Sequence, residues 1–118
     1  MTSLNYRLTD KCIQIESPEG AIHKANFKWP IAEVLQLGEF LIVRTSPEIG
    51  SCSNQNVHAV DQSGKIVWTV SHRKHVYDDS PYTKILEVNG SLKLYNWDGF
   101  ELTVNPSNWT EVASSYGK

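Results

Sequence analysis

The sequence predicts an all-β fold, because three four-residue turns of similar composition recur at equal spacing along the chain. The turns are Ser17–Gly20, Asp61–Gly64 and Asn105–Asn108, and each starts 44 positions after the one before it. A strand-like residue pair precedes each turn, and strand-like residues follow the first two. A period in the forties is the size of one four-stranded unit, so we expect about two and a half such units. The predicted architecture is an antiparallel meander of about eight to ten strands, built as propeller-blade-like hairpins or as a small barrel or sandwich.

Composition and charge limit the class of protein. The 118 residues suit a single domain, 1–118, that needs no disulfide or metal to fold. The net charge of -2 provides no long-range attraction for nucleic acid. The sequence contains no apolar run long enough for a membrane-spanning helix and no secretion signal at its start. We therefore expect a cytoplasmic protein without nucleic-acid or membrane partners, in which Cys12 and Cys52 are small buried apolar residues.

The first third of the chain predicts a hairpin. Residues 1–10 are a loose arm or a first edge strand, and Cys12–Ile15 has the alternation of a half-buried strand. The chain reverses at Ser17–Gly20, where Pro18 presets φ and the glycine accepts a positive φ, and Ala21–Phe27 returns.

The next segment supports two interpretations. Pro30 and Gly38 are residues that begin and end helices, which would give one short helix near 30–37. Alternatively, Val34–Leu37 is a strand that turns at the glycine into Phe40–Val43. The strand is our prediction, and the continuous apolar run of Phe40–Val43 indicates burial on both faces of its sheet.

The rest of the chain alternates hairpins with two long loops. The loops are Thr45–Gln55 and Ser71–Pro81, and Asp61–Gly64 joins two strands between them. Asn89-Gly90 is the strongest two-residue hairpin signal, because both turn positions need positive φ. The strands expected in this part are Asn56–Val60, Lys65–Val70, Tyr82–Val88, Ser91–Tyr95, Phe100–Val104 and Trp109–Ala113.

One segment, Asn56–Trp68, resembles the repeat of quinoprotein-type (PQQ-like) β-propellers. In that repeat a strand ending in Asp leads through a turn ending in Gly-Lys to a strand ending in Trp. On this resemblance, Asp61, Gly64 and Trp68 are the structural signature, from which the third unit at Asn105–Asn108 departs. A closed propeller typically needs about four blades or more. The resemblance therefore implies blade-like hairpins and neither a closed propeller nor a quinone cofactor.

A chain with too few blades to close a propeller has a consequence for assembly. A blade-like sheet buries one face on each neighbour, so the end units of a short array would expose apolar faces and strand edges. A second copy of the chain could cover them, and a two-fold dimer is the commonest oligomer. We therefore expect a homodimer.

Two groups of side chains are candidates for a functional site. Four aromatic residues could line a pocket for a planar or sugar-like ligand, although Trp97 could instead cover the end of the sheet. These residues are Trp97, Tyr82, Tyr95 and Trp68. His72, His75 and Asp78 could bind a divalent metal, but His-x-x-His on a loop fixes no geometry, so we expect no metal and no cofactor.

The sequence predicts a non-catalytic interaction protein that self-associates. It contains no nucleophile elbow, phosphate-binding loop or dinucleotide fingerprint. The alternative is a small-ligand binding module that uses the aromatic residues. An enzyme centred on His72 and His75 is the third possibility.

Overall fold

The part of the chain that the structure describes forms eleven antiparallel strands in three sheets and contains no helix. The structure is a computed structural model, and it describes residues 4–73 and 77–115. The N-terminal sheet contains β1 (Asn5–Leu8), β2 (Cys12–Glu16) and β3 (Ile22–Asn26). The middle sheet contains β4 (Ile31–Leu37), β5 (Phe40–Thr45), β6 (Val57–Val60) and β7 (Ile66–Thr69). The C-terminal sheet contains β8 (Tyr82–Val88), β9 (Ser91–Asn96), β10 (Phe100–Asn105) and β11 (Thr110–Ser115).

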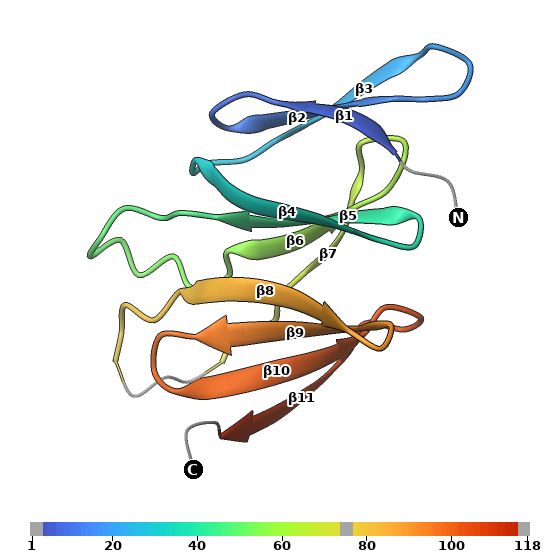
Figure 1. Ribbon diagram of the computed structural model, residues 1–118. Helices are drawn as coiled ribbons and strands as arrows, with labels where there is room; N and C mark the ends of the chain where they lie inside the picture. The colour runs from blue at the N-terminus through green and yellow to red at the C-terminus, as the bar shows by residue number, and fades with distance from the viewer. Residues whose placement is uncertain (1–3, 74–76, 116–118) are drawn as a thin grey trace.

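The three sheets are meanders that stack face to face in chain order (Figure 1). Strands that follow one another in the sequence lie side by side in each sheet, and every pair is antiparallel. The predicted all-β meander is confirmed, whereas none of the sheets closes into a barrel. The strand number exceeds the expected eight to ten because the start of the chain, at Asn5–Leu8, forms an edge strand rather than a loose arm.

Two apolar cores fill the spaces between the sheets, so the middle sheet is buried on both faces. Leu41 and Val43 of β5 pack against the N-terminal sheet, and Ile42 packs against the C-terminal sheet. All three side chains are fully buried. The two-sided burial predicted from the apolar run Phe40–Val43 is therefore confirmed.

The ambiguous segment is a strand, and the helix near 30–37 is wrong. Ile31–Leu37 pairs with β5 along its length. Gly38 has a φ of 61° and forms a two-residue turn with Glu39, which sets Leu37 opposite Phe40. A positive φ at that position reverses the chain into a hairpin, so the glycine ends a strand here instead of a helix. Asn89 and Gly90 form the other two-residue turn, with φ of 50° and 81°, as predicted.

The three equally spaced turns occupy the same place in the three sheets, because each joins the last two strands of its sheet. In each, the amide of the fourth residue donates to the carbonyl of the first, at 2.9, 3.1 and 3.3 Å. Gly20 and Gly64 close the first two turns with φ of 88° and 81°. The third turn is one residue longer, and the positive φ, 59°, falls on Trp109. This shared geometry supports the internal repeat, which itself stays a prediction.

The second turn is fixed by the carboxylate of Asp61. Its Oδ1 accepts hydrogen bonds from the amides of Ser63 and Lys65, at 2.9 and 3.0 Å, and from the Ser63 hydroxyl at 2.7 Å. Burial is the largest single effect and raises the pKa of this carboxyl, but the hydrogen bonds and the charge of Lys65 together outweigh it and hold the pKa below its usual value. Asp61 therefore has a structural role in its turn.

The turns that join β2 to β3, β4 to β5, β6 to β7, β8 to β9 and β10 to β11 lie at one end of the stack, and the long connections lie at the other (Figure 1). We call the end formed by residues 46–56 and 70–81 the connection end. Asn56 ties its two segments together: its Nδ2 donates to the carbonyls of Thr45 and Tyr82, at 2.8 and 2.9 Å, and its Oδ1 accepts from the Tyr82 amide at 2.8 Å. Asp79 accepts from the amides of Gly50 and Cys52, at 2.8 and 3.2 Å.

Both cysteines are free thiols. We predicted that both are buried, and this is wrong, because Cys12 is half-buried and Cys52 is exposed. Cys12 is half-buried because it points away from the middle sheet, alternating with the buried Ile13. Cys52 is exposed on the loop that Asp79 holds. The error arose because an isolated cysteine in a sequence does not show which face of a strand or loop it occupies.

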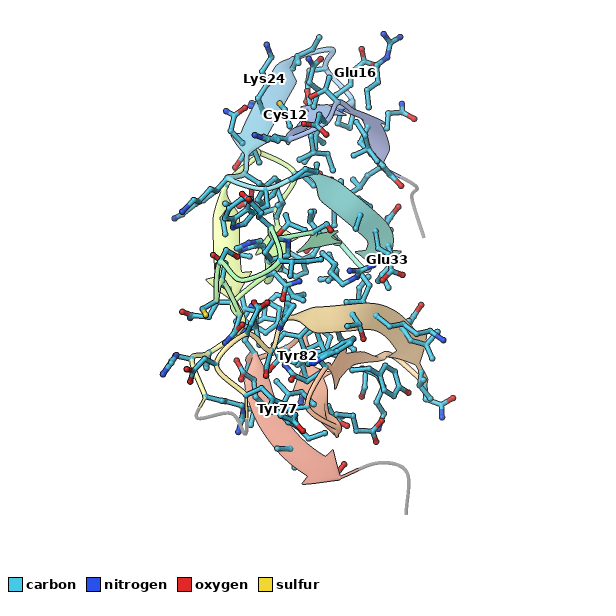
Figure 2. All side chains as sticks on the ribbon, turned by 90° about the vertical axis from the view of Figure 1, so that its left-hand side faces the viewer. Cys12, Glu16, Lys24, Glu33, Tyr77 and Tyr82 are labelled. Atoms are coloured by element: carbon cyan, nitrogen blue, oxygen red, sulfur yellow. The ribbon has the colours of Figure 1, made fainter. Side chains whose placement is uncertain are left out.

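The outer faces of the stack are polar at their centres. On the C-terminal sheet, Lys93, Glu101 and Thr103 alternate with the buried leucines and valine of β9 and β10. Lys93 Nζ lies 2.8 Å from Thr103 Oγ1 and 3.7 Å from Glu101 Oε1. On the N-terminal sheet, Glu16 and Lys24 point outward (Figure 2). The end faces are thus not the bare apolar surfaces that we expected, and the homodimer inferred from them stays a prediction.

Candidate functional site

The four aromatic residues singled out from the sequence do not line one cavity. Tyr82 and Trp68, which are 2% and 9% exposed, belong to the core between the middle and C-terminal sheets. Figure 2 shows Tyr82 in this position. Trp68 stacks on Trp109, with ring centroids 5.2 Å apart and an interplanar angle of 14°. Tyr95 alternates with buried residues along β9 and so points to the opposite face of the sheet from Tyr82. Trp97 is 65% exposed in the turn between β9 and β10.

The predicted metal candidates are only partly within the described residues. His75 lies outside them. His72 is exposed, and Asp78 accepts a hydrogen bond through its backbone carbonyl from Asn54 Nδ2 at 2.7 Å. Within residues 4–73 and 77–115, no group of three or more His, Cys, Asp or Glu side chains is placed to hold a metal ion.

The connection 71–73 is anchored to β11 by a buried carboxylate. Glu111 Oε2 accepts from the amide and the hydroxyl of Ser71, at 3.0 and 2.8 Å. Arg73 lies 3.6 Å from Glu111 Oε1, and the Glu111 side chain is only 6% exposed. Burial raises the pKa of the Tyr82 hydroxyl far above its usual value, against the opposing effect of Arg73. Tyr82 is therefore neutral at physiological pH. The contacts of Glu111 with Ser71 and Arg73 hold the connection against β11.

A candidate site at the connection end is a pocket of about 390 Å³, which we call the connection pocket. It opens where the chain crosses from β3 to β4 and where residues 52–56 lead back into β6. Its volume lies within the range of small-ligand sites. Its walls include Asn26, Phe27, Lys28, Trp29, Gln55, His58 and His72.

His58 of β6 is one of the residues that line the connection pocket. Its Nδ1 lies 2.8 Å from Thr69 Oγ1, and its ring centroid is 5.2 Å from that of Phe27 at an angle of 33°. Burial lowers the pKa of His58 to about 4, so the imidazole is neutral at pH 7. Because Nδ1 is engaged by Thr69, Nε2 is the ring nitrogen left for a bound molecule.

The polar groups of the pocket differ in how far they are already used. The side-chain amides of Asn54 and Asn56 hold the backbone of the two connections. Gln55 uses its Nε2 on the Val70 carbonyl, at 3.0 Å. Lys28 Nζ lies over the Trp29 ring, 5.0 Å from its centroid. Among the described residues that line the pocket, none is Asp or Glu.

The sequence did not identify this pocket, because its parts are far apart in the chain. Phe27 and Trp29 lie in one connection, Gln55 ends another, and His58 points inward from a strand. Only the closely spaced aromatic pair before Pro30 was a local signal, and that signal also fits a strand entering a core.

A second candidate site is the free edge of β1. Tyr6 pairs with Ile15 and Leu8 pairs with Ile13, so these side chains share the inward face of the N-terminal sheet. The isoleucines are fully buried, whereas Tyr6 is 38% and Leu8 is 48% exposed. In the other sheets the corresponding strands, β5 and β9, are each flanked by a further strand, β4 or β8. Among the described residues, no strand flanks β1 on that side.

The start of the described chain contacts β4 of the middle sheet. The Leu4 amide donates to Gln36 Oε1 of β4 at 2.9 Å. Leu4 also packs on the core between the first two sheets, together with Val34 of β4. The open edge of β1 therefore lies close to β4.

Comparison with known proteins adds a family to this description. No curated protein matches the chain, and no solved structure matches it either. The described residues include no helix that is both long enough and apolar enough to span a membrane. Residues 4–113 match the family model described as "Domain of unknown function (DUF7957)", and the chain therefore belongs to that family.

Proposed function

We propose that this protein is a non-catalytic interaction protein that binds an extended segment of a partner along the free edge of β1. The observation that carries the proposal is the exposure of Tyr6 and Leu8, 38% and 48%, on a face whose neighbouring residues are fully buried. A bound strand would lie beside β1 as β4 lies beside β5 and β8 beside β9. Backbone hydrogen bonds would supply affinity, and alternate side chains would supply specificity.

The exposed side chains define the chemistry of the bound segment. Its inward residues should be apolar, because they would cover Tyr6, Leu8 and the half-buried Val34. Its outward residues should be polar, because they would extend the outer face that carries Glu16 and Arg7. An alternating segment of about the length of β4 or β8 meets both requirements.

The test supplies the fourth strand within the chain. The nine residues Tyr82–Gly90, which are β8 and its Asn-Gly turn, are placed directly before Ser3. If the edge accepts a strand, the fused segment folds back onto β1. Several new cross-strand pairs then form, at about 0.2–1 kcal/mol each. We expect the melting temperature to rise by roughly 5 °C and the β1 amides to exchange more slowly with solvent.

The matched control is the same extension with proline at the positions of Leu86 and Val88. Proline cannot donate a backbone hydrogen bond, so this extension should leave the melting temperature unchanged. Equal melting temperatures for both extensions, with unchanged exchange at β1, would contradict the proposal.

Self-association is the case in which a second copy of the chain provides the segment. Light scattering of the unmodified protein measures this directly. Leu8→Lys should then weaken the dimer, whereas Ile22→Lys, at an exposed position on β3 facing the other way, should leave it intact. If the protein is monomeric at all concentrations, the bound segment belongs to a different partner and not to a second copy of the chain.

A further inference from the structure

We propose that the connection pocket binds a small planar carboxylate, with its ring against Phe27 and His58 and its carboxylate toward Lys28. This inference is independent of the free edge of β1. It concerns a different end of the N-terminal sheet and a different kind of ligand.

The shape and the aromatic walls favour a planar ligand. The pocket has a volume of about 390 Å³, which is enough for a molecule of one or two rings. Phe27 and His58 both line it, with their rings 5.2 Å apart and tilted by 33° to each other, and Trp29 lies on the same connection as Phe27. Aromatic rings offer a ligand of this type large contact area at low conformational cost.

The charges favour an anion over a cation. The described lining contains one lysine and no Asp or Glu, and His58 is neutral at pH 7. Lys28 Nζ lies over the Trp29 ring, 5.0 Å from its centroid, so its ammonium lies beside an aromatic residue of the lining. A carboxylate that pairs with this ammonium would keep its own ring in contact with the aromatic walls.

Two further polar groups of the lining can form a hydrogen bond with the ligand. Thr69 engages Nδ1 of His58, which leaves Nε2 for the ligand. Gln55 uses its Nε2 on Val70, which leaves its Oε1 to accept a hydrogen bond. These two groups suit a ring that carries a hydroxyl or an N–H.

Three probes with the same ring and different charge test the proposal: benzoate, benzamide and benzamidine. Binding is followed in the native protein by two-dimensional NMR of the backbone amides and of the histidine ring. We expect benzoate to bind about fivefold more tightly than benzamide, which is the scale of one partly exposed ion pair. Benzamidine should bind more weakly than either, and shifts should be confined to residues 26–29, 52–58 and 72.

Variants separate the charge contact from the ring contact. Lys28→Gln should reduce the benzoate preference to about one without abolishing benzamide binding. Phe27→Leu should weaken all three probes together. Lys84→Gln, an exposed lysine of β8 outside the pocket, should leave the three affinities unchanged.

The order of affinities decides the outcome. The proposal would be overturned if benzamidine bound as tightly as benzoate or more tightly. It would also be overturned if none of the three probes bound. Benzoate binding that Lys28→Gln and Lys84→Gln weaken equally would also overturn it, since the preference would then arise from general surface charge.

Discussion

His58 is buried beside Phe27 without a charged partner among the groups that set its pKa, and this makes it sensitive to acid. Burial alone lowers its pKa to about 4, from 6.5 in the unfolded chain. Between these two values the unfolded state binds a proton that the folded state does not. Protonation of His58 therefore favours unfolding as the pH falls through this range. The stability that depends on a neutral His58 is fully present only above pH 6.5.

The loss is large enough to measure. We expect His58 to lower the free energy of unfolding by about 3 kcal/mol between neutral pH and about pH 4. Urea unfolding of the native protein and of His58→Gln, at several pH values in this range, measures the difference. The variant should lack the part of the pH dependence that belongs to the imidazole. Parallel profiles for the two proteins would show that His58 already binds its proton in the folded state.

Gly20 and Gly64 occupy the same position in two turns of one type, and they differ only in their surroundings. Both have a positive φ, 88° and 81°. A Cβ on Gly20 would meet nothing within 4 Å, whereas one on Gly64 would lie 3.0 Å from the Lys24 carbonyl and 3.1 Å from His23 Cβ. The second turn therefore packs directly on β3, and only a glycine leaves room for that contact.

This pair of glycines separates backbone strain from steric contact. Gly20→Ala should cost about 1–2 kcal/mol, because alanine is strained at positive φ. Gly64→Ala should cost that amount and a further 1–3 kcal/mol or so, because backbone atoms of β3 must move. Urea or thermal unfolding gives both values. Equal costs would mean that β3 moves away freely and that the contact at Gly64 contributes nothing.

The strands and turns were predictable wherever a local pattern determined them. The Asn89-Gly90 hairpin and the strand Tyr82–Val88 match the structure because short-range turn chemistry and alternation suffice there. The segment 30–37 remained open, since Pro30 and Gly38 also fit a helix. Its pairing with β5 decided the matter, and pairing between segments is not visible in composition.

The candidate sites were less predictable because they depend on tertiary placement. Tyr82 and Tyr95 were grouped as one pocket, but the alternation of β8 and β9 directs them to opposite faces. The connection pocket combines residues some 30 positions apart, Phe27 and His58 among them, and no local pattern connects them. Conversely, the exposure of Tyr6 could only be noticed once the number of strands in each sheet was known.

The whole molecule is a stack with two apolar interfaces and two polar outer faces. This is the arrangement by which arrays of similar units limit their own growth, since the end units carry polar residues on the side without a neighbour. On the C-terminal sheet the outward row across the four strands is Leu86, Lys93, Thr103 and Val112. The two polar residues at its centre interrupt what would otherwise be a continuous apolar strip.

Removing that interruption should make the stack associate. We expect Lys93→Leu with Thr103→Val to produce larger species than the native protein in sedimentation velocity, increasing with concentration, because the strip becomes continuous and exposed. The control is Thr9→Val with Lys11→Leu, the same two exchanges at exposed positions beside the turn between β1 and β2. If the strip variant sediments as the native protein does, polar residues at this face are not what prevents further stacking.

The burial of β5 on both sides has a consequence for how its alignment is chosen. In a strand with one solvent-exposed face, a shift of the pairing register by one residue is unfavourable, because every apolar side chain would move from the core face to the solvent face. Neither face of β5 is exposed to solvent at Leu41, Ile42 and Val43, so such a shift would only exchange one apolar contact for another. The alignment must then be specified from the strand's two ends, by the tight reversal at Gly38 and by the 2.6 Å pair between Arg44 and Glu33.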